Sequence, residues 1–189
     1  MTGTFDRSLH PHQRTWLDAI DRYRMRWPRE SDSIDLFRDL MSAHADAAER
    51  TRASEHLTGS AWLVSKDGER VLLTHHRKLN RWLQPGGHAD GDSDLARVAL
   101  REAEEESGLR DLIVEPAIFD LDRHEIPARG DEPAHWHYDV RYVVHATGSE
   151  DFVVSEESHA LAWGEIAQIV ADSAADESLR RMAGKWLAR

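Results

Sequence analysis

Apolar residues recur every three or four positions along the first quarter of the chain. This period is typical of amphipathic helices. Two runs show it, over residues 10–27 and 31–51, and Pro28 separates them. Their apolar positions are Trp16, Leu17, Ile20, Tyr23 and Trp27 in the first run, and Ile34, Phe37, Leu40 and Met41 in the second. We therefore predict a helical N-terminal extension over residues 1–56, which packs against the rest of the chain or forms a subunit interface.

From residue 57 the pattern changes to the short apolar runs of β-strands. Residues 59–76 contain two such runs around Asp67-Gly68, a pair suited to a hairpin turn. Residues 77–94 are rich in glycine and turn residues, which predicts a loop. Further strands are predicted over residues 112–126 and 135–148, and further helices over residues 93–107 and 176–189; residues 158–170 are predicted to be a strand that runs into a short helix. This order predicts an α/β domain over residues 57–189, with a mixed sheet packed against helices.

The predicted helix over residues 93–107 ends in an unusual concentration of acid. Asp92 or Ser93 is a candidate N-cap, and Gly108 is suited to end the helix. Four of the five positions from 102 to 106 are glutamate. Acids at a helix C-terminus are unfavourable by about 0.3–1 kcal/mol each when exposed. A bound cation would compensate for this cost, whereas a solvated acidic helix end is the alternative interpretation.

The helical period decides which glutamates could share a cation. At 100° per residue, Glu102, Glu105 and Glu106 fall on one face and Glu104 falls on the opposite side. Carboxylate oxygens are suitable ligands for magnesium or manganese. Arg101 lies four residues before Glu105, a spacing at which it can pair with that carboxylate or orient it.

Composition and charge narrow the classes of partner. The chain has 24 basic and 35 acidic residues and a formal net charge of −11, which disfavours binding to duplex nucleic acid. It has no cysteine, so disulfides and zinc–thiolate sites are excluded, and a reducing compartment is favoured. The first residues lack the apolar segment of a secretory signal, and no apolar run reaches the length needed to cross a bilayer. We predict a cytoplasmic protein with no membrane partner.

The stretch "GGHADGDSDLARVALREAEEESGL" resembles the signature of the Nudix hydrolases, G-x5-E-x7-R-E-U-x-E-E-x-G-U, where U is bulky or aliphatic. The match begins at Gly87 and ends at Leu109, and Arg101-Glu102 and Glu105-Glu106 occupy the charged positions. One position departs, because the first glutamate of the motif falls on Ser93. Ser93 is then a candidate helix cap, with Asp92 or Asp94 as a substitute charge. This departure leaves the number of metals and the catalytic rate open.

The resemblance implies an α/β/α sandwich with a mixed sheet and a divalent-metal-dependent hydrolase. Such enzymes cleave a nucleoside diphosphate linked to another group, through attack of water on phosphorus. By resemblance, Mg²⁺ or Mn²⁺ would be held by the Gly86 carbonyl, Glu102, Glu105, Glu106 and a downstream acid for which Glu157 is the candidate. Glu102, Glu105 and Glu157 are each candidates for the general base, and Arg101 completes the catalytic set.

Two further polar clusters are candidates for substrate binding. The stretch "THHRKLNRW" is a basic island in an acidic chain and contributes Arg77, Lys78 and Arg81 as candidate phosphate contacts. His88, inside the motif, is a further candidate. In "HWHYD", His135 and His137 are predicted on the same face of a strand. His137 is a candidate substrate contact, although two histidines so placed can also bind a transition metal or simply face water.

Two other functions are consistent with the family resemblance. The first is a non-catalytic Nudix module that binds a ligand or regulates a partner. The second is a diphosphate isomerase, which the absence of cysteine disfavours for the isoprenoid type. The intact R-E-x-x-E-E-x-G core favours catalysis over the non-catalytic module. The partners implied are a small phosphorylated nucleotide-type substrate and a second copy of the chain, with the N-terminal helices as the candidate dimer interface.

Overall fold

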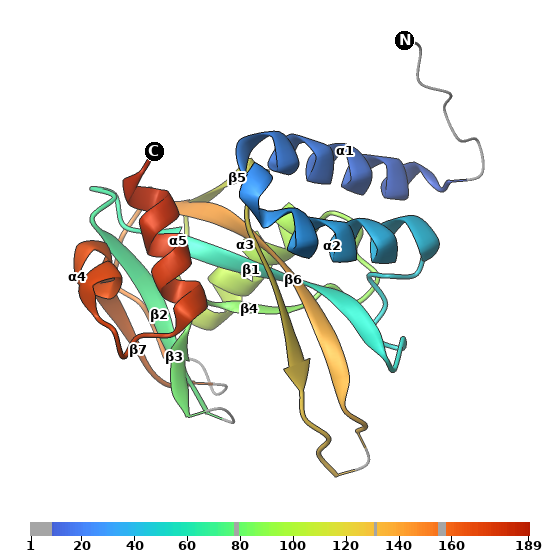
Figure 1. Ribbon diagram of the computed structural model, residues 1–189. Coiled ribbons are helices and arrows are strands. Elements are labelled where there is room, and N and C mark those ends of the chain that lie inside the picture. Colours follow the sequence, from blue (N-terminus) through green and yellow to red (C-terminus); the bar gives the residue numbers. More distant parts are fainter. Residues whose placement is uncertain (1–8, 78–79, 131, 155–157) are drawn as a thin grey trace.

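A mixed β-sheet forms the centre of the protein. The computed structural model describes residues 9–77, 80–130, 132–154 and 158–189 (Figure 1). Its strands are β1 (Glu55–Val64), β2 (Arg70–His76), β3 (Arg81–Leu83), β4 (Gly86–His88), β5 (Leu112–Ile126), β6 (His135–Ala146) and β7 (Ser158–Glu165). The main strand order is β3-β2-β1-β6-β5, with β4 paired to β1 and β7 paired to β2. Because β1 and β6 are parallel while the other pairs are antiparallel, the sheet is mixed, as predicted.

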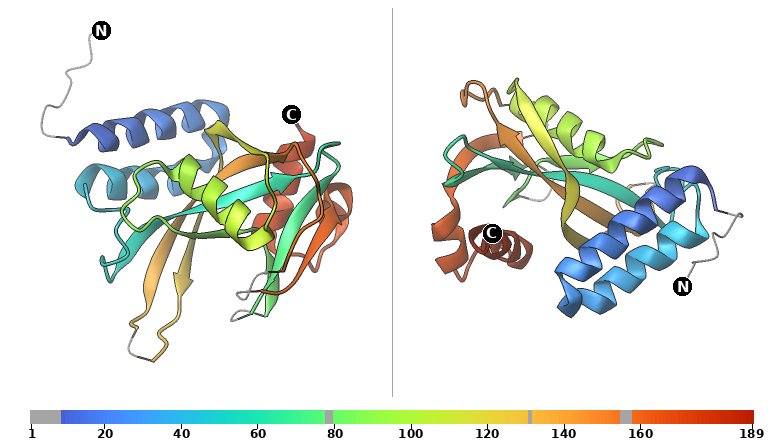
Figure 2. Two further views of the ribbon diagram at one scale, coloured as in Figure 1. Left: turned by 180° about the vertical axis from the view of Figure 1, so that it is seen from behind. Right: turned by 90° about the horizontal axis from the view of Figure 1, so that it is seen from above.

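Helices cover both faces of this sheet. They are α1 (Pro11–Arg26), the short 3-10 helix η1 (Pro28–Glu30), α2 (Ser31–Ala43), α3 (Leu95–Ser107), α4 (Ile166–Ala171) and α5 (Glu177–Leu187). Figure 2 shows α3 on one side of the sheet and α4 and α5 on the other. The predicted α/β/α arrangement is therefore confirmed. None of the helices in the described residues combines the length and the apolar character that crossing a bilayer requires.

The central strand β1 shows why two helical layers fit against one sheet. Successive side chains of a strand point to opposite faces. Gly59 faces α3 so closely that an added Cβ would lie 2.8 Å from Cγ1 of Val98. Trp62 belongs to the opposite face, where it is fully buried in a cluster with Leu179 and Met182 of α5. The alternation along β1 thus gives the protein one hydrophobic cluster on each side of the sheet.

The N-terminal helices join the cluster on the α3 side. Helices α1 and α2 run in opposite directions on either side of Pro28 (Figure 1), and their buried side chains share one hydrophobic core with α3. Two hydrogen bonds also connect α1 and the turn after α2 to the segment before α3. Trp16 Nε1 donates to the Ser93 carbonyl at 2.8 Å, and the Gly91 amide donates to the Ala48 carbonyl at 3.0 Å. The division of the chain at residues 56 and 57 stays a prediction.

The structure differs from the predicted elements at three places. The second N-terminal helix ends at Ala43 instead of continuing to Thr51, and turns follow it. Strand β1 begins at Glu55, because β6 pairs with it from that residue onward. The predicted loop over residues 77–94 contains β3 and β4. Both are three-residue strands, which are too short to show a periodic pattern in the sequence.

Candidate active site

Helix α3 has the predicted end but a different start. Asp94 is its N-cap, and Asp94 Oδ1 accepts a hydrogen bond from the Arg97 amide at 3.1 Å. The candidates Asp92 and Ser93 are therefore wrong as caps. Asp92 instead accepts from the Asp94 amide at 2.9 Å, which shapes the turn before the helix. Gly108 ends α3 in the left-handed conformation, with φ of +69°, as a glycine readily does.

The carboxylates of Glu102 and Glu106 both approach the short strand β4. Glu106 is only 7% exposed, and its Oε1 accepts a hydrogen bond from the Gly86 amide at 2.8 Å. Glu102 lies over Gly87, where an added Cβ would come within 2.5 Å of Glu102 Oε2. Glycine at position 87 therefore leaves the space that the carboxylate occupies. Glu105, predicted on the same helix face, has an exposed side chain.

Arg101 reinforces this convergence by a contact that differs from the predicted one. Its guanidinium Nη2 donates to Glu102 Oε1 at 3.0 Å and to the His88 carbonyl at 2.9 Å. The predicted pairing with Glu105 is replaced by these bonds because the β4 backbone offers Arg101 an acceptor beside Glu102. Arg101 thus links α3 to β4 and positions one of the two carboxylates.

The donor atoms at this site suit a hard divalent cation. Glu102 and Glu106 supply carboxylate oxygens from adjacent turns of one helix, and both face the backbone of Gly86 and Gly87. Oxygen ligands of this kind are those that Mg²⁺ and Mn²⁺ prefer. The residues present therefore fit the metal that the sequence motif implies.

The predicted basic substrate contacts lie on a different part of the sheet. Arg77 follows β2 and Arg81 begins β3, and both side chains are exposed. Arg81 forms an ion pair with Asp176, at the start of α5, with an N–O distance of 3.4 Å. This contact directs Arg81 to the α5 side of the sheet. Lys78 and Glu157, the remaining predicted phosphate contact and downstream acid, lie outside the described residues.

Four histidines converge beside β4, on the face of the sheet opposite α3. Each contributes one ring nitrogen, and these four nitrogens all lie within 4.8 Å of one another. The four residues, which we call the histidine cluster, are His56, His88, His135 and His137. The predicted same-face placement of His135 and His137 is confirmed, because their Nε2 atoms are 3.2 Å apart. His56 was missed by sequence reasoning, since one histidine at a strand start carries no local signal.

Burial lowers the pKa of three of these rings, those of His56, His88 and His137. Burial and, to a smaller extent, the neighbouring imidazoles lower the pKa of His137 to about 2, because a second positive charge nearby would be repelled. Burial is also the largest cause that lowers the pKa of His56 and the pKa of His88. Neutral imidazoles have a free lone pair, which is the form that binds metals.

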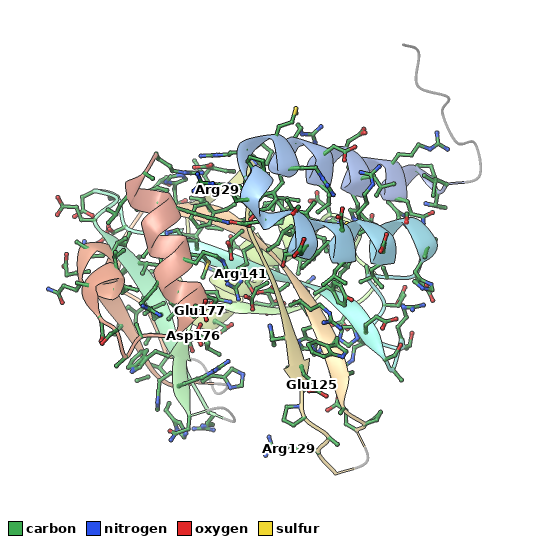
Figure 3. The ribbon with its side chains drawn as sticks, viewed as in Figure 1. Arg29, Glu125, Arg129, Arg141, Asp176 and Glu177 are labelled. Atoms are coloured by element: carbon green, nitrogen blue, oxygen red, sulfur yellow. The ribbon has the colours of Figure 1, made fainter. Side chains whose placement is uncertain are left out.

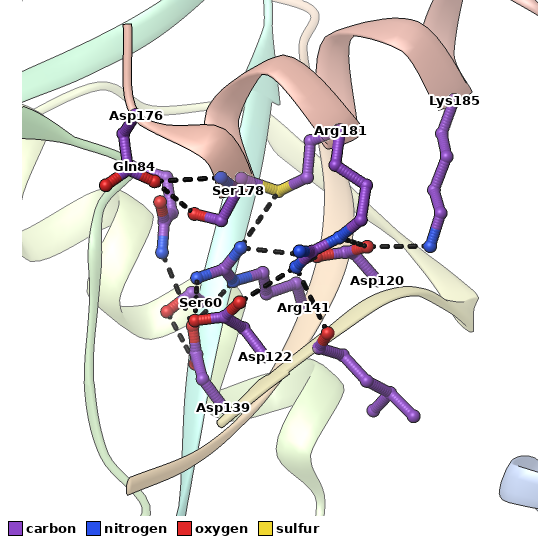
Figure 4. A network of polar contacts seen from close by, with 12 residues as sticks. Ser60, Gln84, Asp120, Asp122, Asp139, Arg141, Asp176, Ser178, Arg181 and Lys185 are labelled. Carbon is purple, nitrogen blue, oxygen red and sulfur yellow. Dashed lines mark hydrogen bonds and ion pairs between the residues drawn. The ribbon is translucent and has the colours of Figure 1, made fainter. Parts of the chain in front are cut away.

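A buried charge network lies next to the histidine cluster on the same face. Figure 4 shows it, and Figure 3 shows its central residue, Arg141, between α5 and the sheet. Arg141 donates to Asp139 at 2.7 Å and to Asp120 at 3.2 Å, and all three side chains are at most 2% exposed. Burial alone would raise the pKa of Asp120, but the hydrogen bond from Arg181 and the charge of Arg141 outweigh it, so this pKa is lowered.

This network compensates its own charge. Three carboxylates face three cations, and the members are Asp120, Asp122, Asp139, Arg141, Arg181 and Lys185. Ser60 also donates to Asp139 at 2.7 Å, so the network reaches from β1 to α5. Such pairing is what permits charges to be buried. We therefore assign this network a structural role, in which it connects the sheet to α5.

The fold is an α/β/α sandwich in which two carboxylates of one helix meet the backbone of a glycine-containing strand. Comparison with protein families agrees with this class, because the model of the NUDIX domain matches residues 55–184. The chain therefore belongs to the Nudix hydrolase superfamily. Among curated proteins it is similar to the m7GpppN-mRNA hydrolase of Xenopus laevis, at 42% identity over 57 residues. This match covers 28% of the chain and only 19% of that relative.

Solved structures show the same fold over a longer stretch. The Ap4A hydrolase of C. elegans, in a binary complex, superposes with a TM-score of 0.55 and 18% identity over 70% of this chain and 95% of that one. The dihydroneopterin triphosphate pyrophosphohydrolase of E. coli gives a TM-score of 0.56 and 17% identity, over 70% and 94% of the two chains. At these identities the likeness establishes the fold alone.

Proposed function

We propose that this protein hydrolyses a diphosphate bond in a nucleoside diphosphate that is linked to another group, with Mg²⁺ or Mn²⁺ as the cofactor. The observation that carries the proposal is the convergence of Glu102 and Glu106 on the two glycines of β4. A diphosphate is densely negative, and its hydrolysis requires neutralisation of charge and an in-line water nucleophile.

Each residue of the site has a physical role in this proposal. Glu102 and Glu106 would hold the metal, which supplies charge neutralisation to the phosphates when bound. The Gly86 amide holds the Glu106 carboxylate, and Arg101 holds that of Glu102, so both acids are positioned before substrate arrives. Glu105 is exposed on the next turn, where it is accessible to solvent as a further ligand or as a general base.

The candidate substrate contacts lie on a different part of the sheet from the carboxylates. Arg77 and Arg81 are exposed cations on the β2–β3 hairpin and are our candidates for contacts to substrate phosphate or sugar. The similar proteins reported above are an Ap4A hydrolase, a dihydroneopterin triphosphate pyrophosphohydrolase and an m7GpppN-mRNA hydrolase. We infer a nucleotide-type substrate of small size. A cytoplasmic location and a homodimer formed through α1 and α2 also stay predictions.

The test measures release of phosphate products from a panel of nucleoside diphosphate derivatives. Each substrate is incubated with Mg²⁺, with Mn²⁺ and with EDTA. The key variant is Glu106→Gln, because glutamine keeps an oxygen that can accept from the Gly86 amide and so preserves the local fold. We expect metal-dependent turnover of one substrate class by the native protein and its loss in the variant.

Glu104→Gln is the matched control. It removes the same charge from the same helix, at a position that the helical period places on the opposite side from Glu102 and Glu106. Turnover that survives EDTA, or that falls equally in both variants, would contradict the proposed roles. Glu102→Gln and Glu105→Gln, measured over a range of pH, then distinguish the candidates for the general base.

A further inference from the structure

The histidine cluster is assembled by strand pairing from three different strands. Residues His56 and His137 are directly paired across the parallel strands β1 and β6. His88 of β4 is paired with Thr58, two residues after His56 and therefore on the same face of β1. His135 lies two residues before His137 on β6. The register of the sheet thus brings all four imidazoles together on the face opposite α3.

The tautomers of two of these rings are fixed by backbone carbonyls. Since a carbonyl oxygen only accepts, Nδ1 of His56 must donate to the Arg52 carbonyl, at 3.2 Å. Nδ1 of His135 likewise donates to the Pro133 carbonyl, at 2.9 Å. In a neutral ring the other nitrogen, Nε2, then carries the free lone pair. Such a carbonyl partner on the far side of the ring is typical of metal-bound histidines.

The Nε2 atom of His56 strengthens this interpretation. His56 is only 3% exposed, and its Nε2 has no hydrogen-bond partner within the part of the chain that the structure describes. A buried acceptor without a partner is destabilising and calls for an explanation. A cation held between the rings would supply that partner.

We propose that the histidine cluster binds one divalent transition-metal ion of the zinc type, separate from the carboxylate site on α3. Nitrogen ligands without thiolates suit Zn²⁺ and its neighbours and are unsuited to Mg²⁺. Tetrahedral Zn–N bonds place ligand nitrogens about 3.4 Å apart. The Nε2 atoms of His135 and His137, at 3.2 Å, already have nearly this separation.

The remaining geometry is within reach of small side-chain rotations. Since no ligand atoms of the cluster are more than 4.8 Å apart, the most distant pair needs to approach by about 1.4 Å to reach tetrahedral spacing. His88 and His137 are partly exposed, which gives an ion a path from solvent. The four ligands complete a tetrahedral shell, so the site is closed, as in structural zinc sites.

The proposed ion would stabilise the position of β4, the strand that Glu102 and Glu106 contact on the opposite face of the sheet. Gly87 faces Glu102, whereas its neighbour His88 faces the histidine cluster, because successive residues of a strand alternate. Holding His88 therefore holds the strand on which Glu102 and Glu106 converge. The ion is assigned a structural role in this position, with the carboxylates left free for the hydrolytic metal.

The test measures zinc binding by the full-length chain without an affinity tag, because a histidine tag would itself bind zinc. The protein is stripped with a chelator, dialysed against Zn²⁺ and analysed for metal content by mass spectrometry, with affinity from competition with a chromophoric chelator. We expect one zinc ion per chain. In His56→Gln/His137→Gln we expect loss of this ion and at least about a 100-fold weaker affinity, since even outer-shell changes cost 10–100-fold.

Two control variants locate the ion. His44→Gln/His145→Gln removes two histidines outside the cluster and should keep the zinc. Glu102→Gln/Glu106→Gln removes the carboxylate site and should also keep it. The proposal is overturned if the native protein binds no zinc, if the His56→Gln/His137→Gln protein retains it, or if the carboxylate variant loses it.

A measurement on the native protein guards against a variant that fails to fold. Co²⁺ replaces Zn²⁺ in tetrahedral sites and then absorbs visible light strongly, whereas octahedral Co²⁺ absorbs weakly. We expect the strong tetrahedral spectrum at one equivalent of Co²⁺, and its displacement by Zn²⁺ but not by Mg²⁺. A weak octahedral spectrum, or displacement by Mg²⁺, would overturn the proposal without reference to any substitution.

Discussion

The paired glycines Gly59 and Gly87 allow a direct test of how α3 and β4 build the active site. They are opposite one another in the β1–β4 pair, and neither has a positive φ, so the backbone tolerates alanine at both. Their surroundings differ. A Cβ at position 87 would meet Glu102 Oε2 at 2.5 Å, whereas a Cβ at position 59 would meet Val98 Cγ1 at 2.8 Å and the Leu95 carbonyl at 3.1 Å.

The size of each effect follows from these distances. Ordinary contact begins at 3.4 Å, so in Gly87→Ala the carboxylate of Glu102 must move by about 0.9 Å, that is 3.4 minus 2.5. A misplacement of about 1 Å in an active site can reduce the rate by about 100-fold. The moving atom is the end of a flexible side chain, so the free energy of unfolding should change little.

Gly59→Ala should have the opposite profile. Its new methyl group meets the core side chain and backbone of α3, which cannot move without repacking. Overpacking of this kind costs about 1–3 kcal/mol. For a chain of this length the melting temperature should fall by about 2–12 °C.

The assay combines kinetics with calorimetry on both variants. The rate kcat/KM is measured with Mg²⁺ on the substrate that the panel identifies, and Tm is measured without substrate. We expect Gly87→Ala to lose about 100-fold in kcat/KM with a Tm close to that of the native protein. Full activity in Gly87→Ala, or a loss of Tm as large as that of Gly59→Ala, would refute the assigned position of Glu102.

Three further predictions concern charges. Arg141→Met should lower the free energy of unfolding by about 3–5 kcal/mol, because it leaves buried carboxylates uncompensated. Urea denaturation measures this, with the exposed Arg97→Met as control. The native protein should lose stability as pH falls below about 4, because the pKa of Asp120 is lower in the folded than in the unfolded state. A midpoint of urea denaturation that stays unchanged down to about pH 2 would contradict this. Arg101→Met should reduce turnover by about 10–100-fold with little change in Tm, because it releases Glu102. Equal activity of Arg101→Met and Arg97→Met would exclude this positioning role.

Local pattern was sufficient to predict the elements that carry their own periodicity. The bounds of β5, the stop at Gly108 and the helical character of the N-terminal segment agree with the predictions, because each depends on neighbours in sequence. The helical wheel also identified Glu102 and Glu106 as one group. It did not distinguish the buried Glu106 from the exposed Glu105, because that difference depends on where β4 lies.

The histidine cluster shows what local pattern cannot reveal. His56 and His137 are adjacent only because β1 and β6 pair in parallel, and that register is decided by contacts between residues far apart in the chain. His135 and His137 were grouped correctly, because a spacing of two places both on one face of a strand. Likewise Arg101 was predicted to pair within its helix, but the carbonyl of His88 on β4 provides a competing acceptor.

The packing of helices α1 and α2 determines whether the Nudix domain of this chain can be isolated as a fragment. The segment common to the family begins at residue 55, yet Trp16 and Ile20 are buried in the same core as Val98. Trp16 also donates a hydrogen bond to the Ser93 carbonyl, in the turn that leads into α3. A fragment that starts at residue 55 would therefore lack part of the hydrophobic core. We expect it to expose apolar surface and aggregate. In this chain the segment shared with the family is therefore shorter than the segment that folds as a unit.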